Sequence, residues 1–115
     1  MRTFKKQAAQ GDLLIMKISK LPKDATPMAA PTDDKNILSH SETGHHHAII
    51  APPTMIQLFG SSNPLVGYMQ VKAQPVELKH FRDYDTHEAL QIDEGIYEIR
   101  RQREHTPEGW RRVED

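Results

Sequence analysis

The sequence has no cysteine, which excludes a disulfide framework and any metal site built on thiolates. A bound metal would have to be held by His, Asp, Glu or water. The chain is also poor in apolar residues, with 37% hydrophobic residues and only three Phe, three Tyr and one Trp among its 115 residues. Such a chain can bury one small core, so we expect a single domain over residues 1–115.

No apolar run is long enough to span a membrane, and the basic start at residues 1–6 is not followed by the apolar core of a signal peptide. The formal net charge of -1 gives no overall attraction to nucleic acid or to an anionic membrane. We therefore expect a cytoplasmic protein with no membrane partner.

Eight prolines and six glycines indicate short elements joined by many turns. Apolar or alternating segments of strand length recur along the chain and predict strands at residues 13–18, 36–40, 44–51, 54–59, 66–73 and 76–80. Turn signals every eight to twelve residues favour a mainly β fold, a small antiparallel β-barrel or sandwich.

Three segments lack such a pattern. They are a basic lead-in at residues 1–11, a long surface loop in the N-terminal half at 22–35, and a C-terminal arm at 106–115. Residues 96–105 suit a helix or a strand, and we leave both open. If this segment is extended, one face carries Tyr97, Ile99, Arg101 and Arg103.

The most distinctive stretch is Gly44–Ala51, in which three consecutive histidines run into an apolar segment. In a strand, His45 and His47 project to one face and His46 to the other. Two residues of rise separate His45 from His47 by roughly 6.6 Å, so their imidazoles can turn onto one ion between them.

A second histidine pair, His80 and His87, follows in a segment rich in carboxylates. In a small β domain a strand end and its loop can face a neighbouring strand, so these imidazoles can converge with the first pair. Three His and a water form an open zinc site, and two His with one carboxylate form a non-haem iron site. The predicted ligands are His45, His47, His80 and His87, and the ion is zinc, or else iron, manganese or nickel.

Two interpretations need no metal. The histidines can be a solvated hairpin end, or two of them can act as general base and general acid in RNA cleavage while an arginine holds the phosphate. The candidate phosphate or partner contacts are Arg100, Arg101, Arg103 and Trp110. Because residues 96–115 hold as many acidic residues as arginines, a salt-bridged surface explains the same charges. Trp110 can equally anchor the C-terminal arm on the domain.

Four short motifs occur in a fixed order: Gln10-Gly11-Asp12, Gly44-His45-His46-His47, the pair His80 and His87, and Arg101-Gln102-Arg103-Glu104. In this order the chain resembles a family of small uncharacterised bacterial and phage proteins with a Gly-His-x-His motif and a C-terminal Arg-Gln-Arg-Glu motif. The resemblance implies no activity. The strand-borne His-x-His also resembles the cupin metal motif, but the glutamate and the glycine-rich flanks of that motif are missing.

We rank three functions. The first is a divalent-metal-binding small β protein with a His cluster, acting as a metal-dependent hydrolase on a phosphate-containing substrate. The second is a phage-type interaction protein that binds and modulates a host protein. The third is a metal-free His-dependent ribonuclease. Partners are thus a host protein or a nucleic acid. Whether the protein is an enzyme, and whether it forms a homo-oligomer, stays open.

Overall fold

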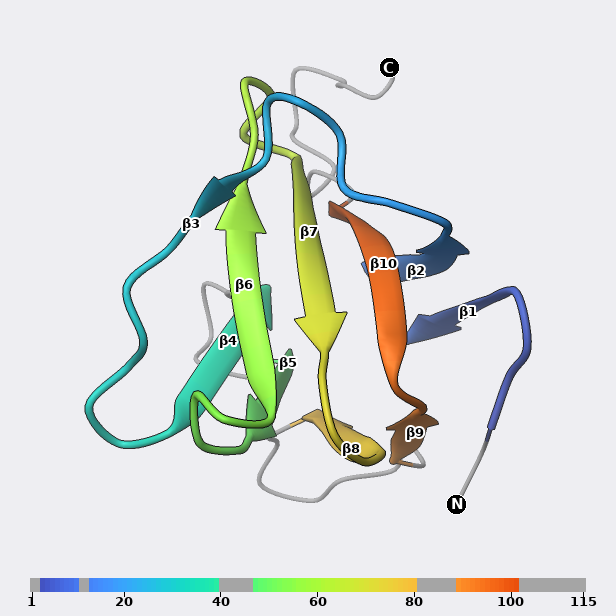
Figure 1. Ribbon diagram of the computed structural model, residues 1–115. Helices are drawn as coiled ribbons and strands as arrows, with labels where there is room; N and C mark the ends of the chain where they lie inside the picture. The colour runs from blue at the N-terminus through green and yellow to red at the C-terminus, as the bar shows by residue number, and fades with distance from the viewer. Residues whose placement is uncertain (1–2, 11–12, 40–46, 81–88, 102–115) are drawn as a thin grey trace, which may run out of the picture.

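The computed structural model describes residues 3–10, 13–39, 47–80 and 89–101, and in these ranges the chain is built from two antiparallel sheets (Figure 1). The six-stranded sheet has the order β1 (Gln7–Gln10), β2 (Leu13–Ile18), β10 (Gly95–Arg101), β7 (Val66–Val71), β6 (Ile56–Gly60) and β3 (Thr26–Pro27). The four-stranded sheet has the order β4 (Lys35–Ser39), β5 (His47–Ile50), β8 (Val76–His80) and β9 (Leu90–Ile92). The predicted mainly β fold is confirmed as a sandwich, because the strands form two sheets and do not close into one barrel.

The two sheets share one apolar core, which follows from the alternation of side chains along each strand. Leu13 and Ile15 on β2 and Tyr97 and Ile99 on β10 are buried residues of the six-stranded sheet. Ile56 on β6 and Met69 and Val71 on β7 belong to the same layer. The four-stranded sheet contributes Leu38, Ile49, Val76, Leu78, Leu90 and Ile92.

Most strand boundaries follow the sequence prediction. The predicted strands at 13–18 and 76–80 are observed with those bounds, and residues 95–101 are a strand and not a helix. Three short strands were not predicted: β1 inside the basic lead-in, β3 inside the long loop, and β9 at Leu90–Ile92. The C-terminal arm at 106–115 lies outside the described residues.

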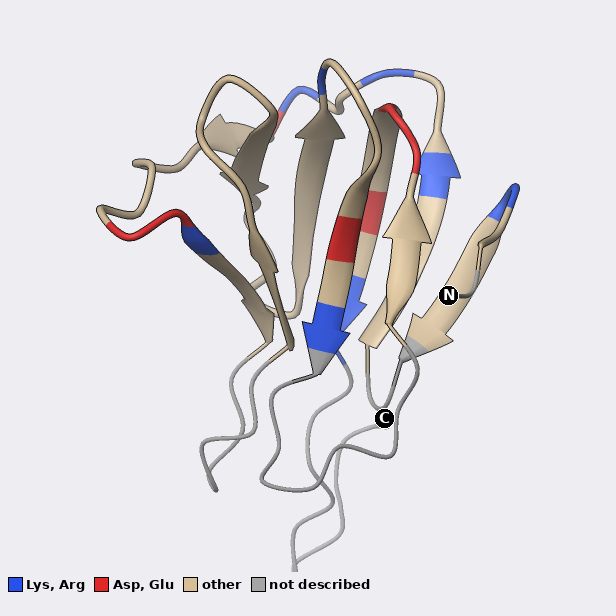
Figure 2. Ribbon diagram, turned by 90° about the horizontal axis from the view of Figure 1, so that it is seen from below, with Lys and Arg blue, Asp and Glu red and all other residues tan. Residues whose placement is uncertain are grey.

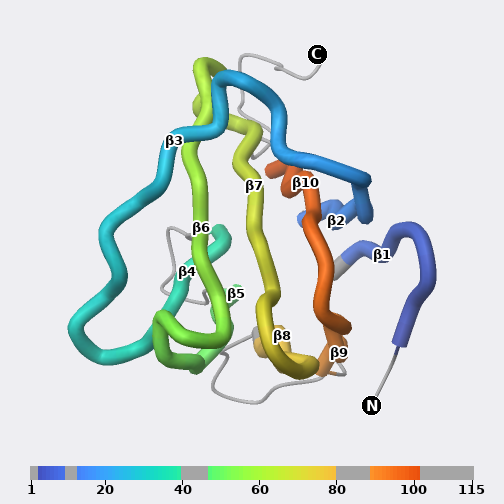
Figure 3. Tube along the Cα trace, viewed as in Figure 1, coloured from blue at the N-terminus to red at the C-terminus, as the bar shows by residue number. Residues whose placement is uncertain are grey.

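The chain crosses between the sheets at the long loop (Figure 3). After β2 it runs to the far edge of the six-stranded sheet, pairs there as β3 with β6, and then enters the four-stranded sheet as β4. Asn36 fixes the start of β4. Its side chain is 5% exposed, and its Nδ2 lies 3.0 Å from the carbonyl oxygens of Asp34, Ile49 and Ala51. One buried amide thus ties β4 to the end of β5.

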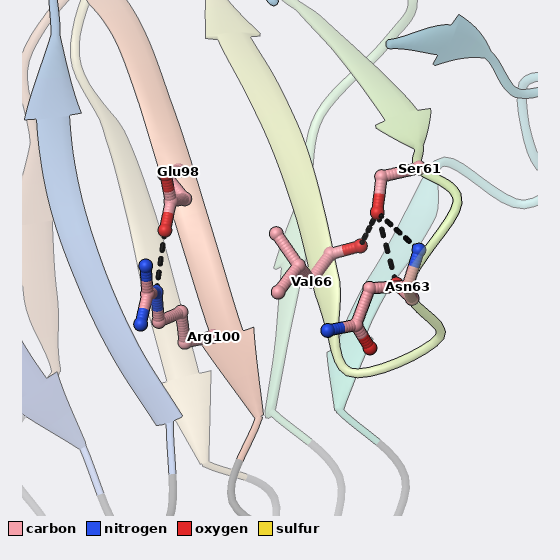
Figure 4. A network of polar contacts seen from close by, with 5 residues as sticks. All are labelled: Ser61, Asn63, Val66, Glu98 and Arg100. Carbon is pink, nitrogen blue, oxygen red and sulfur yellow. Dashed lines mark hydrogen bonds and ion pairs between the residues drawn. The ribbon is translucent and has the colours of Figure 1, made fainter. Parts of the chain in front are cut away.

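The turn between β6 and β7 is held by side-chain hydrogen bonds (Figure 4). The Ser61 hydroxyl donates to the Val66 carbonyl oxygen at 2.7 Å and accepts from the Asn63 amide at 3.1 Å. The backbone amide of Arg101 donates to the Leu65 carbonyl oxygen in the same turn, at 2.9 Å. This turn therefore fixes the C-terminal end of β10.

The described residues contain no helix, and so none that is long and apolar enough to cross a bilayer.

Candidate functional site

Four strands begin or end together at one end of the sandwich (Figure 2). β4 ends at Ser39, β5 begins at His47, β8 ends at His80 and β10 ends at Arg101. Ser39 and His80 are the direct partners of His47 on its two sides. Arg101 reaches this row from the opposite sheet. We call the region defined by Ser39, His47, His80 and Arg101 the histidine end.

His47 is the best-defined predicted ligand. The residue is 4% exposed, and it lies two and four positions before the core residues Ile49 and Ala51. His47 therefore shares the inner face of the four-stranded sheet. Directly opposed residues of antiparallel strands have Cα atoms about 4.5 to 5.5 Å apart, so the β5–β8 register brings the backbones of His47 and His80 close together.

On the other side of His47, the pairing of β4 with β5 is irregular between Ile37 and Ser39. Ile37 pairs with Ala48 and Ser39 with His47, so Leu38 is an extra residue on β4. A bulge of this kind takes the extra residue out of the regular ladder. The Leu38 carbonyl oxygen accepts a hydrogen bond from Nε of Arg101 at 2.5 Å, which links the two sheets.

Arg101 is directed inward by the same alternation that buries Tyr97 and Ile99. It is partly buried, and desolvation lowers the pKa of its guanidinium from the usual value, although arginine stays charged in proteins. Sequence reasoning predicted that Arg101 shares a face with these two residues. It could not predict the Leu38 partner, which is 63 positions away.

Gly67, on β7, makes room for the Arg101 guanidinium. A Cβ atom at this position would lie 3.2 Å from Nη2 and 3.4 Å from Nη1 of Arg101, and 3.0 Å from the Phe59 carbonyl oxygen. Gly67 was not among the predicted site residues. The available signal was an isolated glycine inside a strand, which often marks a close approach of another group.

We expect Gly67→Ala to destabilise the protein by about 1 to 3 kcal/mol, the usual cost of overpacking, in a urea denaturation experiment. In an Arg101→Ala background the same change should cost less, because only the Phe59 contact remains. Such coupling is typical of residues in contact. Equal costs in the two backgrounds would show that the guanidinium does not occupy this space.

Arg100 points the other way. Its side chain is 60% exposed, and its Nε lies 2.5 Å from Oε2 of Glu98 (Figure 4). The prediction of a salt-bridged surface therefore describes Arg100, whereas its neighbour Arg101 turns into the sandwich. The two arginines form a natural pair for comparison.

The other predicted site residues lie outside the described residues. They are His45 and His87 among the ligands, and Arg103 and Trp110 among the contacts. Within residues 3–10, 13–39, 47–80 and 89–101, no three side chains of His, Asp or Glu are placed to hold a metal ion. The structure thus brings His47 and His80 together as backbone neighbours and places Arg101 on the facing strand.

The fold and this end define a small two-sheet β domain with histidine and arginine at one end of the core. The chain belongs to the family described as "Domain of unknown function (DUF8820)", whose model matches residues 9–102. The match runs from β1 to the end of β10, so it includes His47, His80 and Arg101. No curated protein and no solved structure matches the chain.

Proposed function

We propose that this protein binds a divalent metal ion at the histidine end, with His47 and His80 as two of the ligands. The observation that carries the proposal is the β5–β8 register, in which these two histidines are direct partners on neighbouring strands. Side chains of directly opposed residues lie on the same face of the sheet, so two imidazoles at these positions can bind one ion between them. Each zinc–nitrogen bond would be about 2.0 to 2.1 Å long.

The remaining ligands would be His45 and His87, by their positions in the sequence. His45 precedes the first residue of β5 by two positions, so it would share the face of His47 if the extended chain continued. His87 precedes Leu90 by three positions, and Leu90 pairs with Leu78 two residues before His80. Both histidines therefore belong to segments that join strands at this end.

The donor set suits zinc best, because nitrogen ligands without thiolates are common in catalytic zinc sites. Iron, manganese and nickel also accept imidazole and carboxylate ligands. A bound ion of this kind would supply Lewis acidity and an activated water. We propose hydrolysis of a phosphate-containing substrate as the reaction, with the arginine of the same end positioned to contact the substrate.

The proposal is tested by the metal content of tag-free protein purified from medium supplemented with zinc. We expect about one ion per chain by elemental analysis. Removal of the ion by a chelator should lower the melting temperature, because a ligand that binds only the folded state stabilises it. Acidification below about pH 6 should release the ion, since only neutral imidazole binds metal.

Protein that contains no metal and melts identically with and without chelator would contradict the proposal. Two other functions would then be tested. RNA cleavage that survives the chelator would support a metal-free His-dependent ribonuclease. A protein that neither binds metal nor cleaves RNA would fit an interaction protein of phage type that modulates a host protein.

A further inference from the structure

We propose that Arg101 is the residue that binds an oxyanion at the histidine end, and that this oxyanion is a phosphate group. The inference deepens the proposed function, on which it rests for the identification of that phosphate as part of the substrate. Binding of the anion itself requires no metal.

The position of Arg101 is the first argument. Its side chain turns inward at the last described residue of β10, where Nε donates to the Leu38 carbonyl oxygen on the facing sheet. Ser39, the next residue after Leu38, is the direct partner of His47. The guanidinium therefore lies near the paired residues Ser39, His47 and His80, two of which are the proposed metal ligands.

The hydrogen-bonding capacity of the guanidinium is the second argument. Nε is engaged by Leu38, whereas the four N–H donors on Nη1 and Nη2 form the fork that binds phosphate or carboxylate. Gly67, with no side chain, leaves the space in which these two nitrogens lie. The tether at Nε and the space at Gly67 hold the fork in a fixed orientation, which reduces the entropy lost when an anion binds.

The charge of the site is the third argument. Among the residues that the structure describes, no carboxylate forms an ion pair with Arg101, whereas Arg100 pairs with Glu98 on the exposed face. Within the described residues this partly buried cation has no counter-charge, which is unfavourable, and burial lowers the pKa of the guanidinium. An incoming anion would bring negative charge to this position, and a dianionic phosphate would bring more than a carboxylate.

The experiment is a titration of metal-stripped protein with inorganic phosphate after the chelator has been dialysed away. Binding is followed by isothermal titration calorimetry and by the shift in melting temperature at constant ionic strength. The wild-type chain is compared with Arg101→Met and with Arg100→Met, which removes the neighbouring guanidinium on the outer face. Sodium acetate in place of phosphate tests a carboxylate as the ligand.

We expect wild type and Arg100→Met to bind phosphate with similar affinity, and Arg101→Met to bind it at least about tenfold more weakly, the loss expected for a charge-assisted hydrogen bond. Phosphate also stabilises folded proteins generally, so the difference between variants is the result that counts. Arg101→Lys, which keeps the charge without the fork, should retain only part of the affinity.

Equal responses of wild type and Arg101→Met would overturn the inference, as would acetate binding as tightly as phosphate. If Arg101→Met does not fold, the wild-type titration decides: no heat of binding and the same melting temperature in phosphate and in chloride contradict the inference. Because all arms are free of metal, these failures are distinct from a failure of the proposed metal site.

Discussion

Replacement of His47 and His80 together by alanine is expected to abolish stoichiometric metal binding. The two residues are direct partners across β5 and β8, so the double variant removes both proposed ligands that the described strands carry. Metal content after dialysis against zinc, measured by elemental analysis, should fall from about one ion per chain to background. Each single variant should bind more weakly than wild type, since the remaining ligands form an incomplete site.

The control is His105→Ala, because His105 is not among the four predicted ligands His45, His47, His80 and His87. It should bind zinc as wild type does. Circular dichroism of the double variant then shows the role of the ion: a retained β spectrum indicates a functional ion, and loss of the spectrum indicates a structural one. Undiminished zinc binding by the double variant would show that the ion binds at another part of the chain and would contradict the proposed site.

The largest effect on stability is expected for Ile99→Ala. Ile99 is 1% exposed on β10, which lies between β2 and β7, and its side chain belongs to the core shared by both sheets. Truncation of a buried isoleucine costs about 2 to 5 kcal/mol, from lost burial and from the cavity that remains. Since domains are stable by only about 5 to 15 kcal/mol, urea denaturation should show a large loss.

Ile50→Ala is the matched control, because Ile50 is 52% exposed at the end of β5. This variant removes the same atoms from the outer face and should change the free energy of unfolding by about 0.5 kcal/mol or less. Similar losses for the two variants would mean that the inner and outer faces of the strands have been assigned wrongly.

The sequence was sufficient to predict a mainly β fold, either a barrel or a sandwich, because the strands that form the core carry a strong local signal. Leu13–Ile18 is a continuous apolar run, and Val76–His80 alternates, so both were predicted with their observed bounds. The antiparallel pairing of β4 with β5 agrees with the antiparallel fold that the turn signals predicted.

What the sequence could not supply depends on contacts between distant residues. β1 has the sequence Gln-Ala-Ala-Gln, which has neither alternation nor β-branched residues, and it forms a strand because it pairs with β2. The roles of Arg101 and Asn36 depend on carbonyl oxygens in other strands. Alternation predicted that Arg101 shares a face with Ile99, but its partner Leu38 comes from the other sheet.

The most direct measurement of the central claim is anomalous diffraction at the zinc edge from crystals of tag-free, zinc-loaded protein. We expect one strong peak within bonding distance of imidazole nitrogens from both His47 and His80, at the end of the sandwich that also holds Arg101. A map with no peak at these two residues, or with a peak at another part of the chain, would contradict the proposed metal site.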